Sequence, residues 1–130
     1  MTATSIKPRV FLSFSMADRP LAEKVERAFR AAGVEVDSPN TIEAGHDMSD
    51  ALRDALRLSS AVVAVLSEVS HRHEISANVL FEIGAAYSAG KPVYLIVDDP
   101  SSKLPAYLTH ARLFPSARVD EAVREIAAAA

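Results

Sequence analysis

The sequence predicts an α/β fold, a three-layer sandwich in which a five-stranded parallel sheet lies between helices. Two continuous apolar runs, residues 61–66 and 93–97, are rich in valine. Such runs are typical of strands in a parallel sheet that is covered on both faces. The segments between the strand-like runs carry apolar residues at helical spacing. Strict alternation of strands and helices implies right-handed crossovers and therefore a parallel sheet.

Three further segments complete the predicted sheet. Residues 10–14 open it, residues 34–36 alternate as a half-exposed edge strand would, and residues 111–114 are a weaker fifth candidate. Five strands in a chain of this length suit a flavodoxin-like sheet of order 2-1-3-4-5. Ligands of such sheets bind beyond the carboxyl ends of the strands, where the winding reverses between strands 1 and 3. We therefore expect a crevice beside the residues that follow these two strands.

Helical periodicity predicts four helices between and after these strands. Pro20 lies in the first turn of the first helix and Gly33 just past its end, which are typical start and stop signals. Gly90 ends the third helix in the same way. The predicted helices cover residues 21–32, 48–56, 77–89 and 120–129.

The chain has the size and composition of one soluble domain. Its 130 residues include 14 basic and 17 acidic side chains, a net charge of −3, and no cysteine. The lack of a basic excess argues against nucleic acid as a partner, and the absence of cysteine excludes disulfides and thiolate metal sites. No apolar run approaches the ~20 residues of a membrane span, and the N-terminus lacks the apolar stretch of a signal peptide. We expect a disordered tail over residues 1–8, a single domain over residues 9–130, a cytoplasmic location and no membrane partner.

Several chemistries that use this kind of sheet are excluded by missing motifs. Residues 13–18 read Ser-Phe-Ser-Met-Ala-Asp, where a dinucleotide fold needs a glycine-rich turn, and the chain has no P-loop. Residues 66–68 read Leu-Ser-Glu, where a phospho-receiver domain needs an aspartate. The segment from His73 resembles the start of a zinc-protease helix but has Ala77 in place of the second histidine. His71 and His73 could share a metal through loop geometry, but a solvated loop is the favoured interpretation and no metal site is expected.

One polar pair stands out in the third predicted helix. Glu82 is the only charged residue between positions 79 and 86, and a carboxylate is rarely buried without a partner. Asn78 lies four residues earlier and hence on the same helix face. Both would lie beside the predicted crevice and could contact a ligand. Alternatively, Glu82 pairs with Arg53 or Arg57 of the neighbouring helix or lies at an exposed edge, and Asn78 caps the helix.

Four segments of the sequence together resemble a known family. They are residues 9–15 with Asp18, residues 42–45, residues 61–67, and residues 79–86 with 90–93. Their order and spacing resemble the Toll/interleukin-1 receptor (TIR) domain family. They are similar to its opening strand and loop, the loop after its second strand, its third strand, and its third helix with the following strand. The resemblance spans about residues 9 to 100.

The resemblance implies cleavage of NAD⁺ at the nicotinamide–ribose bond by Glu82, with NAD⁺ as the substrate and no cofactor. Some bacterial members cyclise the ADP-ribose into a signal for antiphage defence, which implies a defence partner protein or a sensor of the product. Many bacterial members have tryptophan four residues before the glutamate, where this chain has Asn78. A related TIR-like group in bacterial nucleotide-sensing defence reads Asn-Val-x-Phe-Glu-Leu-Gly there. The same stretch resembles nucleoside 2-deoxyribosyltransferases, whose Phe-Glu-x-Gly segment carries a nucleophilic glutamate.

A single carboxylate suits this reaction. Nicotinamide leaves as a neutral molecule, so positive charge on the ribosyl carbon is what must be stabilised, as in glycoside hydrolysis. A partly desolvated carboxylate does this electrostatically or by a covalent bond. The expected substrate contacts are Ser13, Phe14, Ser15, Asp18, Ser67 and Asn78. For Phe14, which could stack on a base, a simple core role is the stronger alternative.

Two other functions stay open at this point. A non-enzymatic TIR module would signal by self-association, and a nucleoside 2-deoxyribosyltransferase-like enzyme would transfer a deoxyribosyl group. The resemblance also implies oligomers in which the loop after the second strand contributes contacts. Here that loop is residues 38–46, with Ile42 as a candidate apolar tip beside Gly45.

Overall fold

A computed structural model describes residues 8–38, 48–66, 77–98 and 111–129. The predicted strands and helices that fall in these ranges are all present, with ends that differ from the predictions by two residues at most. None of the helices described is long and apolar enough to cross a membrane. The elements are β1 (Arg9–Ser13), η1 (Met16–Asp18), α1 (Arg19–Ala31), β2 (Glu35–Asp37), α2 (Met48–Leu58), β3 (Ala61–Leu66), α4 (Ala77–Ser88), β4 (Val93–Val97), β5 (Arg112–Pro115), η4 (Ser116–Arg118) and α5 (Val119–Ala129).

The five strands form one sheet of order β2-β1-β3-β4-β5, in which every neighbouring pair is parallel. The predicted order is therefore confirmed. In the register of the central strands, Ser13 of β1 lies opposite Ala64 of β3, which in turn lies opposite Leu95 of β4. All strands end at the same edge of the sheet, so the carboxyl end of β1 meets that of β3 there.

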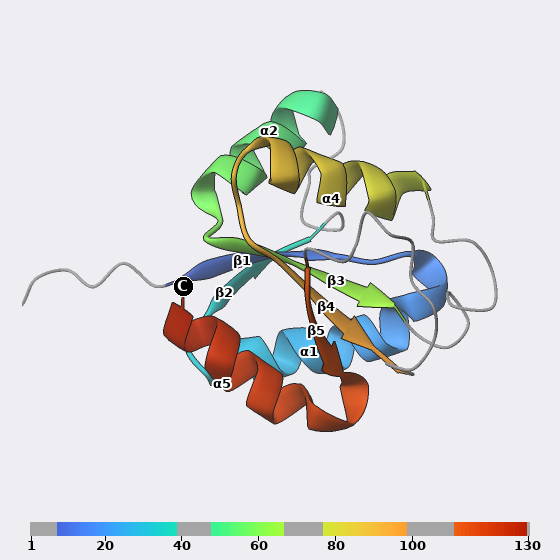
Figure 1. Ribbon diagram of the computed structural model, residues 1–130, viewed down its shortest axis with the longest axis vertical. Coiled ribbons are helices and arrows are strands. Elements are labelled where there is room, and N and C mark those ends of the chain that lie inside the picture. The colour runs from blue at the N-terminus through green and yellow to red at the C-terminus, as the bar shows by residue number, and fades with distance from the viewer. Residues whose placement is uncertain (1–7, 39–47, 67–76, 99–110, 130) are drawn as a thin grey trace, which may run out of the picture.

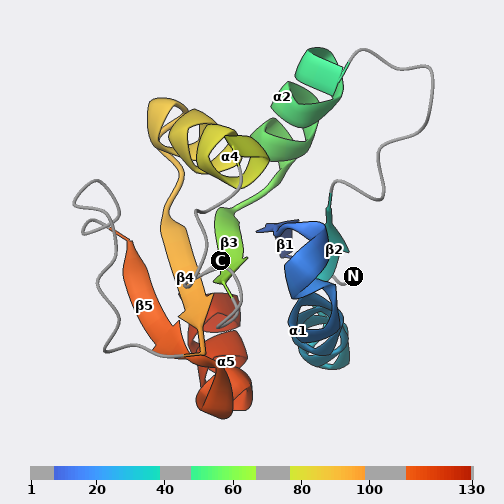
Figure 2. The same ribbon diagram turned by 90° about the vertical axis from the view of Figure 1, so that its right-hand side faces the viewer.

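Helices cover both faces of the sheet, with α1 and α5 on one side and α2 and α4 on the other (Figures 1 and 2). Each layer encloses its own core, and successive strand residues contribute to opposite cores. Val10 and Leu12 of β1 belong to the core under α1 and α5, whereas Phe11 belongs to the core under α2 and α4. By this alternation Ser13, the last residue of β1, faces α4.

Glycine ends two of the helices at the predicted positions. Gly33 follows α1 with φ +80°, and Gly90 follows α4 with φ +71°, a left-handed conformation that residues with a Cβ rarely adopt. After Gly33 the chain turns back, and the N–H of Val34 donates to the carbonyl of Phe29 at 3.0 Å. The glycines thus allow each helix to stop and the next strand to begin within a few residues.

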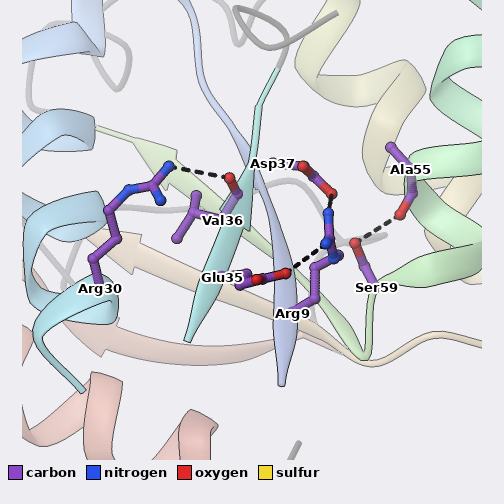
Figure 3. Close-up of polar contacts among 7 residues, drawn as sticks. All are labelled: Arg9, Arg30, Glu35, Val36, Asp37, Ala55 and Ser59. Atoms are coloured by element: carbon purple, nitrogen blue, oxygen red, sulfur yellow. Dashed lines mark hydrogen bonds and ion pairs between the residues drawn. The ribbon is translucent and has the colours of Figure 1, made fainter. Parts of the chain in front are cut away.

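Ion pairs fasten the short edge strand β2 to the sheet (Figure 3). Arg9 of β1 reaches Asp37 at 2.9 Å and Glu35 at 2.5 Å. The hydrogen bond to Asp37 is the main reason that the pKa of the Arg9 guanidinium is raised above its ordinary value. Arg30 of α1 donates to the carbonyl of Val36 at 3.3 Å from the other side. The two ion pairs hold β2 against β1, the strand that carries Ser13, and the hydrogen bond from Arg30 holds β2 against α1.

Candidate active site

Glu82 occupies a core position of α4. The buried residues of this helix are Val79, Glu82, Ile83 and Ala86, which follow the spacing i, i+3, i+4 and i+7. The carboxylate therefore lies on the stripe that packs against the sheet, and only 7% of the residue is exposed. A charged side chain at such a position costs stability unless something compensates for its lost hydration.

The compensation comes from the end of β1. The hydroxyl of Ser13, which is fully buried, donates a hydrogen bond of 2.6 Å to Oε1 of Glu82 across 69 residues of sequence. The sequence predicted both residues as site residues but not this contact. The alternation of side chains along β1 could have indicated this contact. It places Ser13 on the same face as Phe11 and hence towards the helix layer that contains α4.

The alternative of an arginine partner for Glu82 is not seen in the residues described. Arg53 lies 3.6 Å from Asp50, and Arg57 lies 3.8 Å from Asp54, all on the exposed surface of α2. Glu82 is not at an exposed edge either. Within the parts of the chain that the structure describes, its hydrogen-bond partner is a neutral hydroxyl rather than a cation.

Burial and the serine act on the charge of Glu82 in opposite directions. Burial raises the pKa of the Glu82 carboxyl above its ordinary value, because desolvation penalises the charged form. The hydrogen bond from Ser13 favours the charged form and offsets part of this effect. The result is a poorly solvated carboxyl group that can exchange a proton or face a developing positive charge.

A second pair of polar side chains follows β1. Ser15 donates to Oδ2 of Asp18 at 3.1 Å, and the N–H of Asp18 donates to the carbonyl of Ser15 at 2.9 Å. Asp18 is almost completely buried, whereas Ser15 is half-buried. The two residues shape the turn that leads from the carboxyl end of β1 through η1 into α1.

Of the remaining predicted site residues, the two that the structure describes, Phe14 and Asn78, are not buried with Glu82. Phe14 is half-buried and packs against the core under α1 and α5, the opposite side of the sheet from α4, as its alternative core role required. Asn78 is exposed in the first turn of α4. Ser67, Ile42 and Gly45, together with all four histidines, lie outside the described residues.

The outer face of α4 borders a separate groove. It has a volume of about 630 Å³, lies between α2 and α4, and is lined by Leu52, Leu56 and Phe81 together with six smaller or basic residues. Neither Glu82 nor Ser13 lines it. The groove is therefore distinct from the buried carboxyl group on the inner face of the same helix.

The sheet order, the two helix layers and the buried glutamate at the β1–α4 contact define a domain of the doubly wound α/β class with a polar site at its switch point. Comparison with known families makes this more specific, because a profile of the TIR domain family matches residues 10–127. The chain belongs to the TIR domain family. A comparison with curated proteins finds no significant match.

Solved structures show the same fold in proteins of different function. The TIR domain of the Toll-related receptor TRR-2 from Hydra magnipapillata is 17% identical, with a TM-score of 0.68 over 90% of this chain and 89% of that one. The CMP N-glycosidase BcmB from Clostridium botulinum is 20% identical, with a TM-score of 0.62 over 91% of this chain and 96% of that one. At these identities the likeness concerns the fold alone.

Proposed function

We propose that this TIR domain is an NAD⁺ glycohydrolase or ADP-ribosyl cyclase in which Glu82 is the catalytic residue. The observation that carries the proposal is the burial of Glu82 at a core position of α4 with a neutral hydroxyl as its partner. A purely structural carboxylate at such a position would gain more from a cation, and an apolar residue would fit the stripe better. A charge retained there at a cost to stability suggests a role in function.

In the proposed reaction, the bond between the nicotinamide nitrogen and C1′ of the ribose breaks. The bonding electrons go to the nicotinamide, whose ring is cationic in NAD⁺ and leaves as a neutral molecule. Positive charge develops on the ribosyl carbon, and the carboxylate of Glu82 stabilises it within a poorly hydrated site. Water then attacks C1′ and releases a proton to give ADP-ribose, or a nucleophilic atom of the same molecule attacks to give a cyclic product.

Other residues carry supporting roles in this proposal. Ser15 and Ser67, which follow β1 and β3, are proposed to hydrogen-bond the ribose or phosphate groups, and Asn78, which is exposed in the first turn of α4, is proposed as a further ligand contact. Self-association through TIR-type contacts would bring copies together, and the product would act as a signal in antiphage defence.

The experiment is a comparison of three purified proteins incubated with NAD⁺, with released nicotinamide measured by chromatography. They are the parent, Glu82→Gln, and the matched control Glu23→Gln, which alters an exposed glutamate paired with Arg19 on α1. The proposal expects release by the parent and by Glu23→Gln, and a loss of about 10²–10³-fold in Glu82→Gln. Equal rates in all three proteins would refute the role of Glu82.

A second candidate is a nucleotide N-glycosidase, and the structural neighbour with CMP N-glycosidase activity favours it. A neutral pyrimidine leaves less readily than nicotinamide and needs a proton. A carboxyl group whose pKa is raised by burial can supply that proton as a general acid. Incubation with CMP and measurement of free cytosine separates the two candidates, because the leading proposal expects nicotinamide from NAD⁺ and no cytosine from CMP.

A further inference from the structure

We propose that Ser13 is a positioning residue for Glu82. Its hydroxyl holds Oε1 in place, so that Oε2 is the oxygen available to the substrate, and it favours the ionised form of the carboxyl group. The proposal rests on the catalytic role proposed above for Glu82, and it assigns Ser13 a role that a direct substrate contact would not include.

The position of Ser13 in the sheet limits how far its hydroxyl can move. Ser13 ends β1, a central strand paired with β2 on one side and β3 on the other, and its own partner in the register is Ala64. Because Ser13 is buried and its backbone pairs with Ala64 of β3, its short side chain has less freedom to move than the longer side chain of Glu82. The bond of 2.6 Å between two buried groups therefore restricts the glutamate rather than the serine. A carboxylate held in one rotamer is preorganised for a charge that develops at one point in space.

Apart from Ser13, the described side chains of the sheet that face Glu82 are apolar. The strands that pack beneath α4 present apolar side chains on this face: Phe11 from β1, Val62, Ala64 and Leu66 from β3, and Val93, Leu95 and Val97 from β4. The cations of the neighbouring elements, Arg53, Arg57 and Lys91, line the groove on the other side of the helix. Within the residues that the structure covers, Ser13 is thus the polar group that faces the carboxylate.

In the proposed reaction, the hydroxyl of Ser13 keeps Glu82 in the charged form. The developing ribosyl cation needs an ionised carboxylate, while burial among apolar side chains favours the protonated form. The hydrogen bond from Ser13 opposes this effect, as the direction of its influence on the Glu82 pKa indicates. Without it, a larger fraction of the protein would carry a protonated, catalytically inactive Glu82 at a given pH.

The test compares Ser13→Ala, which removes the donor, with Ser13→Thr, which keeps a hydroxyl, and Ser13→Cys, which keeps the volume with a weak donor. The matched control is Ser59→Ala, because Ser59 is also buried but its hydroxyl donates to the carbonyl of Ala55 at 2.7 Å (Figure 3) and not to Glu82. The first readout is the titration of the Glu82 carboxyl carbon by ¹³C NMR, with its signal assigned by its loss in Glu82→Gln.

The expected titration of Glu82 lies at higher pH in Ser13→Ala than in the parent, with Ser13→Thr near the parent and Ser13→Cys between them. Ser59→Ala leaves it unchanged. The second readout is the pH dependence of NAD⁺ cleavage. In Ser13→Ala the acid limb of this profile moves to higher pH. At pH values on the acid side of the shifted limb, kcat of Ser13→Ala is about 10-fold or more below that of the parent, while KM changes little.

Two results would overturn the proposal. One is a Glu82 titration in Ser13→Ala that coincides with that of the parent in a folded protein. The other is cleavage by Ser13→Thr as slow as by Ser13→Ala. The NMR titration needs no turnover, so a parent that cleaves no NAD⁺ would refute the proposed function while the contact between Ser13 and Glu82 is still tested.

Discussion

Replacing Glu82 by glutamine tests the site through stability as well as through rate. The substitution keeps the shape of the side chain and an oxygen that can accept from Ser13, but removes the charge. Glu82 is 7% exposed in the folded protein, and its hydrogen-bond partner among the described residues is the neutral hydroxyl of Ser13. Burial of the charged carboxylate costs stability, and the hydrogen bond from Ser13 offsets part of this cost. Burial of the neutral amide of glutamine costs less. We expect Glu82→Gln to be more stable than the parent at pH 8 by about 1–2 kcal/mol. For a chain of 130 residues this corresponds to a rise in Tm of roughly 3–8 °C in Glu82→Gln.

The pH dependence of this difference follows from the direction of the pKa shift. Burial raises the pKa of Glu82 in the folded state, so the folded protein favours the protonated form more than the unfolded chain does. The contribution of Glu82 to stability is then fully present below the ordinary carboxyl pKa and is lost as the pH rises through the folded-state pKa. The Tm of Glu82→Gln should exceed that of the parent at pH 8, and the excess should shrink towards zero near pH 4.

Differential scanning calorimetry across this pH range, with NAD⁺ turnover measured on the same samples, is the assay. Glu23→Gln, the exposed control on α1, should show neither the pH-dependent gain in Tm nor the loss of turnover. If Glu82→Gln is instead less stable than the parent at pH 8 and cleaves NAD⁺ at the parent's rate, Glu82 has a structural role and the reasoning fails.

Three further predictions concern other parts of the molecule. Arg9→Ala removes the ion pairs to Glu35 and Asp37 and should lower the free energy of unfolding by about 1–2 kcal/mol. Urea titrations should show a smaller loss in 1 M NaCl, because salt screens the ion pairs, and a loss independent of salt would contradict this prediction. Ile42→Asp should weaken self-association with little change in Tm, and equal oligomer size for variant and parent in sedimentation would remove that role for the loop. Ser67→Trp should block nucleotide binding in an equilibrium titration while the far-UV circular dichroism stays that of the parent; undiminished binding would place the site elsewhere.

Much of the fold could be predicted because its elements have strong local signals. The runs at 61–66 and 93–97 are apolar on both faces, which is typical of a parallel strand covered by helices on both sides, and they appear as β3 and β4. The short edge strands gave weaker patterns, and their positions were each predicted one residue too early. At the edges, ion pairs such as that of Arg9 with Asp37 contribute to the pairing, and these depend on tertiary contacts that no local pattern records.

The site was only partly predictable for the same reason. Glu82 was conspicuous because a lone charge in an apolar helix violates the local pattern. Its partner was not predicted, since the contact joins residues 69 positions apart and depends on the register of β1 against α4. The predicted grouping of Asn78 with Glu82 relied on their spacing alone; the structure leaves Asn78 exposed in the first turn, where α4 begins, whereas Glu82 lies one turn further in and is buried.

The most direct test of the central claim, that Glu82 cleaves an N-ribosyl bond, is mass spectrometry of the products formed from NAD⁺ in ¹⁸O-labelled water. The parent is measured beside Glu82→Gln, with phage-infected lysate added to a parallel sample as a source of activator. If Glu82 is the catalytic residue, the parent alone forms nicotinamide together with ADP-ribose that carries ¹⁸O at C1′ or with an unlabelled cyclic form. Intact NAD⁺ in both parent samples, cleavage at the pyrophosphate, or the same products from Glu82→Gln at the parent's rate would contradict it.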